Sequence, residues 1–380
     1  MLQTPHLAVS MAVILFTLLS TGCRHPKTAF YPVGIYSVGK TQDLAVVREA
    51  GFNAVTGPAD RRFLDSARAL DLKVLASPDT SAGTNFNAAA ARRAITRFDA
   101  HPALWSWYVV DEPDFQRISP EAVVAANHSI KHAGARKPTS LVLWQGASAL
   151  HYANITDITM IDRYPVPWLP LANFSQHLRD TRLALGKDKP MIAVIQAFDW
   201  NAYPELVPGE KGLRPPTREE LRCMTYCALA QRANGLFYYA FDSGTWRIRE
   251  HPETWQAVQE VVGEVNRYLP LFQAQHLWSP WVQDYRDWSR RFNAALEGSI
   301  TPALLRVNQG NDLVPAGDYI LAVNTTDQDH HYRLRIIPLR SGVARVLGED
   351  RVVPLDSGWF EDDFGPYAVH VYGPLPGGKK

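Results

Sequence analysis

The chain has 380 residues, a formal net charge of +1 and 11 Trp, 15 Tyr and 15 Phe residues. This length is too great for one small domain and fits one barrel-sized domain followed by a modest second one. Lys and Arg are spread evenly along the chain, which argues against nucleic acid as a partner, because nucleic-acid binding needs a basic patch. The many aromatic residues suit a packed core or a site that stacks flat rings against a ligand.

The first 23 residues have the pattern of an export signal. Leu7 to Leu19 is an apolar run of signal-peptide length, too short to span a bilayer comfortably. It ends in Leu19-Ser20-Thr21-Gly22-Cys23, which resembles the bacterial lipobox, although no Lys or Arg precedes it. The resemblance implies a lipoprotein whose diacylated Cys23 is the mature N-terminus and anchors the chain to a membrane. Arg24 rather than Asp at the next position favours the outer membrane, facing the periplasm or the cell surface; the alternative is an ordinary signal peptide.

Residues 24–274 alternate short apolar segments with helical patterns, which predicts a (β/α)8 barrel. Alternating strands and helices form parallel sheets, and eight such units over about 240 residues match the usual size of this barrel. The strands are expected at Val33–Val38, Asn53–Gly57, Lys73–Ser77, Leu104–Val110, Ser140–Trp144, Ile158–Ile161, Met191–Gln196 and Gly235–Phe241. The helices are expected at Gln42–Ala50, Arg61–Leu70, Asn87–Ala100, Pro120–Ala133, Leu171–Leu185, Arg218–Ala233 and Pro252–Leu271, with the fifth helix short or missing.

Residues 275–374 show a different pattern, in which short alternating strands are separated by turn residues. This predicts a small antiparallel β-sandwich, followed by a tail at 375–380. The strands are expected at Ala303–Val307, Asp318–Val323, Tyr332–Ile337, Ala344–Leu347 and Tyr367–Tyr372. Cys223 and Cys227 fall four residues apart in one expected helix, where a disulfide would be strained, so we expect both to be buried thiols.

The most informative segment is the fourth expected strand, which runs into Asp111-Glu112-Pro113. The strand-to-helix loops of a barrel form its catalytic face, so these carboxyls should lie at the mouth. Glycoside cleavage needs an acid that protonates the leaving oxygen, and apolar walls or a neighbouring negative charge can raise a Glu pKa to suit it. The structural alternative is an acidic pair at the N-terminus of the next helix.

Together with Asp162-Arg163-Tyr164-Pro165 after the sixth strand and Tyr238-Tyr239 in the eighth, this motif resembles the barrel glycoside hydrolases. The resemblance covers residues 30–372 and implies that Glu112 is the catalytic acid. Retaining members of the large barrel clan carry a nucleophilic Glu at the end of strand seven. Gln196 stands there instead, and an amide cannot form a stable glycosyl-enzyme ester.

Three alternatives therefore stay open. Hexosaminidase-type barrels pair an Asp and a Glu at strand four, so Asp111 could orient a substrate acetamido group as the nucleophile. Asp162 or Asp242 could instead be the second carboxylate, as nucleophile or as base. Finally, the barrel could have lost hydrolysis and be a non-catalytic glycan-binding surface lipoprotein.

The expected partner in each case is a carbohydrate, because Trp rings stack on sugars while amides and carboxylates take their hydroxyls. The expected contacts are Tyr164, Gln196, Tyr239, Trp144, Gln145, Trp200, Trp246 and Asp79. The sequence contains no dinucleotide-binding or phosphate-binding loop and no metal-ligand spacing, so we expect neither a cofactor nor a metal.

Overall fold

The computed structural model describes residues 30–78, 86–277, 281–284, 291–292, 299–335 and 341–376. Cys23, with the rest of the expected signal, and Asp79 lie outside the described residues. From Tyr31 onward the chain clusters into one compact unit. Across the described ranges, no helix combines the length and the apolar character that a membrane span requires.

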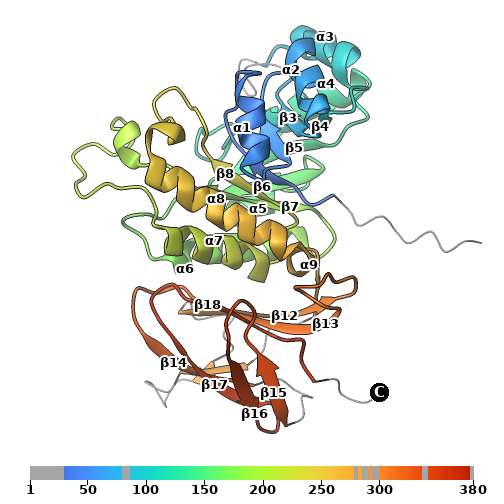
Figure 1. Ribbon diagram of the computed structural model, residues 1–380. Helices are drawn as coiled ribbons and strands as arrows, with labels where there is room; N and C mark the ends of the chain where they lie inside the picture. Colours follow the sequence, from blue (N-terminus) through green and yellow to red (C-terminus); the bar gives the residue numbers. More distant parts are fainter. Residues whose placement is uncertain are drawn as a thin grey trace, which may run out of the picture. The chain divides into compact units, whose positions relative to one another are not determined.

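The predicted (β/α)8 barrel is confirmed: eight parallel strands close on themselves in the order β1 to β8 (Figure 1). They are β1 Val33–Ile35, β2 Ala54–Thr56, β3 Lys73–Ala76, β4 Leu104–Val110, β5 Thr139–Leu143, β6 Ile158–Asp162, β7 Met191–Gln196 and β8 Leu236–Tyr239. Strand β1 ends earlier than predicted: the backbone of Ser37 is left-handed, with φ 64°, and its amide donates to the Thr56 hydroxyl rather than to a strand carbonyl. Strand β8 closes the barrel by pairing Phe237 with Gly34.

The helices lie where the sequence predicts them. They are α1 Asp43–Glu49, α2 Arg61–Ala69, α3 Ala88–Phe98, α4 Pro120–His132, α5 Ala149–Tyr152, α6 Leu171–Leu185, α7 Arg218–Ala230, α8 Pro252–Arg267 and α9 Leu269–Phe272. Helix α7 begins with a capping box between Thr217 and Glu220, which satisfies two backbone donors of its first turn. Helix α5 is as short as expected, and the backbone before it lies against α6: a Cβ on Gly146 would be 2.2 Å from the His177 carbonyl oxygen.

The C-terminal part forms the predicted antiparallel β-sandwich. One sheet has the order β11-β10-β14-β17, a second has the order β18-β13-β12-β9, and β15 pairs with β16. The bounds are β9 Gln275–His276, β10 Trp281–Asp284, β11 Arg291–Phe292, β12 Ile300–Val307, β13 Gly317–Asn324, β14 His330–Arg335, β15 Gly342–Arg345, β16 Val352–Leu355, β17 Trp359–Phe364 and β18 Val369–Tyr372. The sequence pattern missed β9, β10, β11, β16 and β17. The outward positions of β17 are acidic and pair with basic residues such as Arg333 on β14.

The sheet that contains β12, β13 and β18 packs on barrel helices α6 and α7. The Ser175 and Thr301 hydroxyls are hydrogen-bonded at 3.1 Å, and Arg222 donates to the Val369 carbonyl at 3.1 Å. Cys223 and Cys227 are free and buried, as expected, and the Cys223 thiol lies 3.5 Å from the Asn324 carbonyl oxygen. Helix α7 is thus covered by the barrel on one side and by this sheet on the other.

Candidate active site

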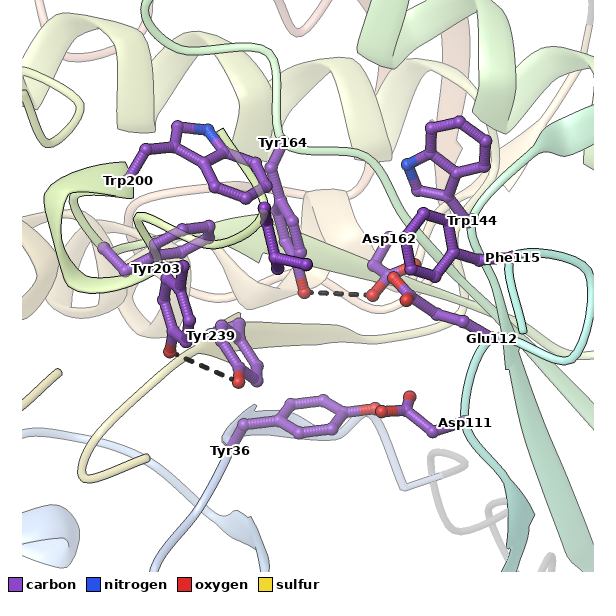
Figure 2. A pocket seen from close by; sticks show the side chains of 12 residues that line it. Tyr36, Asp111, Glu112, Phe115, Trp144, Asp162, Tyr164, Trp200, Tyr203 and Tyr239 are labelled. Carbon is purple, nitrogen blue, oxygen red and sulfur yellow. Dashed lines mark hydrogen bonds between the residues drawn. The ribbon is translucent and has the colours of Figure 1, made fainter. Parts of the chain in front are cut away.

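A pocket with a volume of about 250 Å³ opens at the carboxyl ends of the barrel strands (Figure 2). This is the end of a (β/α)8 barrel at which enzymes place their catalytic groups. The pocket combines three carboxyl groups with aromatic and apolar walls. Its lining residues are Tyr36, Asp111, Glu112, Phe115, Trp144, Asp162, Tyr164, Phe198, Trp200, Tyr203, Leu206 and Tyr239.

Glu112 enters the pocket because the chain turns sharply where β4 ends. Its backbone is left-handed, with φ 39°, a conformation that costs a non-glycine residue about 1–3 kcal/mol and is concentrated at functional sites. The turn is held by the backbone N–H of Gln116, which donates a hydrogen bond to the backbone carbonyl of Glu112 at 2.9 Å. Regular alternation would point Asp111 and Glu112 to opposite faces of the strand. The left-handed turn breaks this alternation, and both carboxyls line the same pocket.

Asp162 is the last residue of β6 and is buried, with 5% of its surface exposed. Its Oδ2 accepts a hydrogen bond from the Tyr164 hydroxyl at 3.0 Å. The Glu112 carboxyl lies at the same end of the pocket (Figure 2), close enough that a side-chain hydrogen bond between the two carboxyls shifts the pKa of each. Two ionised carboxylates cannot bond to one another, so this contact requires a shared proton. Among the described residues, no hydrogen-bond donor reaches the buried Oδ1 of Asp162, so this oxygen is free to share a proton with Glu112.

Burial raises the pKa of Glu112 to about 7, and the negative charge of Asp111 acts in the same direction. The pKa of Asp162 is also well above its usual range, first because the group is buried and then because Glu112 and Asp111 repel its negative form. A carboxylic acid that keeps its proton near neutral pH, in a cleft, can act as a general acid.

Asp111 is the third carboxyl of the site. It is open to solvent on the pocket side, but protein atoms crowd it from the other sides, and this crowding raises the pKa of its carboxyl. The Tyr108 hydroxyl donates a hydrogen bond to its Oδ1, which acts in the opposite direction and holds the side chain in place.

The floor of the pocket is a row of tyrosines. The ring centroids of Tyr36 and Tyr239 are 5.7 Å apart, and those of Tyr239 and Tyr164 are also 5.7 Å apart. On one side the Tyr203 hydroxyl donates to the Tyr239 hydroxyl at 3.4 Å, and Trp200 stands above Tyr164.

The opposite wall is formed by two rings next to Glu112. Phe115 and Trp144 meet edge to face with ring centroids 5.3 Å apart. Trp144 also contacts Arg163, whose guanidinium lies 5.0 Å from the centroid of the indole ring. Phe115 is 49% exposed and lines the pocket, so its ring is accessible to a ligand.

The structure brings together seven of the residues singled out in the sequence: Glu112, Asp111, Asp162, Tyr164, Tyr239, Trp144 and Trp200. It adds five that were missed: Tyr36, Phe115, Phe198, Tyr203 and Leu206. Tyr36 directly follows the first strand, so its position at a strand end could have indicated it. Phe115, Tyr203 and Leu206 lie in loops, whose course the strand and helix pattern does not predict.

Four other predicted residues do not line this pocket. Gln196 is completely buried, and its amide is bonded to the backbone of Val166. Trp246 is buried too, because its loop folds back and stacks the indole on His251 with centroids 4.0 Å apart. Gln145 is exposed outside the pocket, and Asp242 lies in a neighbouring hollow, where it pairs with Lys40 and Arg247.

Within the described part of the chain, no group of three or more His, Cys, Asp or Glu side chains is arranged to hold a metal ion. The pocket therefore offers proton-transfer groups and ring surfaces. Its described lining contains three carboxyls and neither Lys nor Arg, so it suits a neutral ligand that has apolar faces and hydroxyl groups.

No protein-family model matches the sequence, and no curated protein matches it. Several solved structures share its architecture. An alpha-amylase from Geobacillus thermoleovorans, complexed with acarbose, is 10% identical with a TM-score of 0.55, over 90% of this chain and 97% of that chain. AmyP in complex with maltose is 9% identical with a TM-score of 0.51, over 87% and 88% of the two chains. A Bacteroides fragilis protein described as an alpha-galactosidase/melibiase is 9% identical with a TM-score of 0.54, over 90% and 78%. At these identities the similarity shows the fold alone, a (β/α)8 barrel followed by an antiparallel β-sheet region.

Proposed function

We propose that the protein is a glycoside hydrolase in which Glu112 is the general acid. The observation that carries this proposal is the pKa of about 7 at Glu112, in an aromatic pocket at the catalytic end of the barrel. Glycoside cleavage requires a proton on the leaving oxygen, and a Glu with a pKa near 7 is protonated in a large share of the molecules at neutral pH. The ring surfaces on both sides suit the apolar faces of a sugar.

The contact between Glu112 and Asp162 limits the role of Asp162. Retaining glycosidases hold their two carboxyls about 5–5.5 Å apart, and inverting ones about 6.5–9.5 Å apart, because a sugar carbon or a water lies between them. Hydrogen-bonded carboxyls are closer than either. We therefore assign Asp162 to holding and tuning Glu112, as a positioning residue, rather than to attack on the sugar.

Asp111 is then the carboxylate left to assist the attack. It lines the pocket next to Glu112 and faces the tyrosine floor. In the substrate-assisted reaction, the acetamido oxygen of the substrate bonds to the anomeric carbon while the bond between that carbon and the leaving oxygen breaks. The leaving oxygen takes the proton of Glu112. Asp111 holds the acetamido N–H and stabilises the positive charge of the resulting ring. Water then opens that ring, giving its proton back to Glu112.

The test uses 4-nitrophenyl and methyl glycosides of N-acetylglucosamine, N-acetylgalactosamine, glucose and galactose. For the sugar that is cleaved, Glu112→Gln should lower kcat/KM, which reports the step that breaks the glycosidic bond, by about 10²–10⁴-fold for the methyl glycoside. It should lower kcat/KM much less for the 4-nitrophenyl glycoside, because nitrophenolate leaves without a proton. Equal losses on the two substrates would contradict an acid role for Glu112.

The same panel separates the assisting group from its alternatives. If Asp111 orients an acetamido group, only the N-acetylated substrates are cleaved and a thiazoline analogue inhibits. Cleavage of the non-acetylated sugars alone would remove Asp111 from that role. Binding of a glycan without turnover, in the wild type as well as in Glu112→Gln, would point instead to the glycan-binding alternative.

We also propose that Cys23 is lipidated and anchors the protein to a bacterial membrane. The support is the sequence pattern that ends in Thr21-Gly22-Cys23. In cells fed labelled palmitate, the label should be lost in Cys23→Ala and kept in Cys223→Ala. Label that persists in Cys23→Ala would dismiss the anchor.

A further inference from the structure

A second hollow adjoins the pocket and belongs to the other half of the barrel mouth. It has a volume of about 390 Å³ and lies over the carboxyl ends of β1, β2, β3 and β8. Its lining is Tyr36, Ser37, Val38, Gly39, Thr56, Gly57, Leu75, Ser77, Tyr108, Asp111, Tyr239 and Asp242. Tyr36, Asp111 and Tyr239 line both spaces, so the two spaces meet at these three side chains.

The position of Glu112 fixes the direction in which a substrate chain would run across the two spaces. It lines the first pocket, together with Phe115 and Trp144, and it is not among the residues that line the second hollow. The acid must lie beside the leaving oxygen, so the leaving group belongs on the Phe115 and Trp144 side. The sugar whose bond is cleaved then lies over the tyrosine floor beside Asp111, and the hollow receives whatever is attached to the far side of that sugar.

The chemistry of the hollow suits a neutral sugar. Hydroxyl-bearing and glycine residues form much of its wall, and the carboxylates of Asp111 and Asp242 can accept hydrogen bonds from sugar hydroxyls. Asp242 is held in place by Lys40 at 3.4 Å, by Arg247 at 3.5 Å and by the Gly244 amide at 3.1 Å. Neither Lys nor Arg belongs to the described lining, which disfavours a uronate or a sulfated sugar.

We propose that this hollow binds a second, neutral sugar unit on the non-reducing side of the cleaved bond, so that the substrate is a chain laid across the barrel mouth rather than a single terminal sugar. This inference rests on the proposed function, because Glu112 as the acid sets the direction of the chain. Binding energy gained in the hollow, away from the reacting atoms, is available to lower the barrier at the cleaved bond.

Gly39 offers a clean way to fill the hollow. A Cβ on Gly39 would meet no heavy atom within 4 Å, and its backbone is outside the left-handed region. A phenylalanine there therefore starts from open space at the wall of the hollow, while an alanine adds only the Cβ. Gly57 is unsuitable, because a Cβ there would be 2.5 Å from the Phe63 ring.

The experiment compares kcat/KM for 4-nitrophenyl disaccharides and monosaccharides of the sugars in the panel above. In the wild type and in Gly39→Ala, the disaccharide should be favoured by about tenfold or more. In Gly39→Phe this ratio should fall to about one. A ratio near one in the wild type, or an undiminished ratio in Gly39→Phe, would overturn the proposal.

A binding measurement keeps this test separate from that of the proposed function. Glu112→Gln, alone and combined with Gly39→Phe, is applied to an array of neutral oligosaccharides of one to six units. Retention that grows with chain length and is lost on adding Gly39→Phe supports the hollow even when no substrate is turned over. Retention that is independent of chain length, or no retention at all, overturns it.

Discussion

Gln196 and Val166 are joined by a pair of hydrogen bonds that ties the end of β7 to the loop after β6. Gln196 Oε1 accepts from the Val166 amide at 2.9 Å, and Nε2 donates to the Val166 carbonyl at 2.8 Å. The same Nε2 also lies 3.3 Å from the Phe198 carbonyl. The side chain is completely buried, so these bonds replace those that water would make.

Restoring a Glu at position 196 should therefore not restore a nucleophile. Gln196→Glu removes the NH₂ donor that two buried carbonyls use, and it places an ionisable group in a fully buried position. We expect a loss of about 2–4 kcal/mol in the free energy of unfolding and no gain in kcat. Denaturant unfolding measures the first quantity, and the same substitution at the exposed Gln145 is the matched control. A gain in turnover with undiminished stability would show that position 196 reaches the substrate.

The pH dependence of kcat/KM should reveal the acid. Activity that needs protonated Glu112 falls as the pH rises through about 7, by about tenfold for each further pH unit. In Asp111→Asn the burial of Glu112 remains, but a negative neighbour is lost, so the alkaline limb should move to lower pH. A limb that stays in place in Asp111→Asn would mean that another group controls it.

Stability should depend on pH through the same residue. The pKa of Glu112 is raised from 4.5 to about 7 on folding, so its contribution to stability is complete below pH 4.5 and is lost as the pH rises through 7. At pH 8 the wild type carries this loss, whereas Glu112→Gln has no charge to bury. We expect Glu112→Gln to be more stable than the wild type by about 3 kcal/mol at pH 8 and nearly equal to it at pH 4.5. Thermal unfolding at the two pH values checks this, and an equal difference at both would contradict it.

The rings of Phe115 and Trp144, which form the wall next to Glu112, should contribute to the affinity for substrate. Trp144→Ala removes a stacking surface for the leaving group, so KM for 4-nitrophenyl glycosides should rise by about tenfold. Phe115→Ala should have a similar effect with little change in stability, because that side chain is 49% exposed. Leu183→Ala, at a position 75% exposed on α6, is the control for removing an exposed apolar group. Unchanged KM in both wall variants would place the leaving group elsewhere.

Much of this site followed from one rule, that the side chains at the carboxyl ends of barrel strands converge. The rule placed Glu112, Asp162 and Tyr239 at the pocket, because each ends a regular strand or lies within two residues of its end. The rule was wrong for Gln196, which it also put at the pocket because that residue ends a strand; the side chain is buried outside the pocket instead. The direction of the side chain at the last strand residue depends on the loops around it. Here the backbone of Val166, in the loop after β6, forms hydrogen bonds with the side-chain amide of Gln196 and holds it outside the pocket.

Backbone irregularities account for the other differences. The left-handed turn at Glu112 brings two successive carboxyls into one pocket, which regular alternation forbids. Trp246, which was expected at the pocket, lies outside it, because its loop returns to the barrel wall and buries the indole against His251. Neither departure leaves a signal in hydrophobic periodicity, which reports the regular elements alone.

The double covering of α7 has a practical consequence for anyone who wants a smaller version of this protein. A helix with apolar residues all round is stable only while both of its neighbours are present. A fragment that ends before β9 would expose Cys223 and the apolar surface of α7 around it to water. We expect such a truncated barrel to aggregate and its exposed thiol to oxidise, so the minimal unit worth expressing runs through β18.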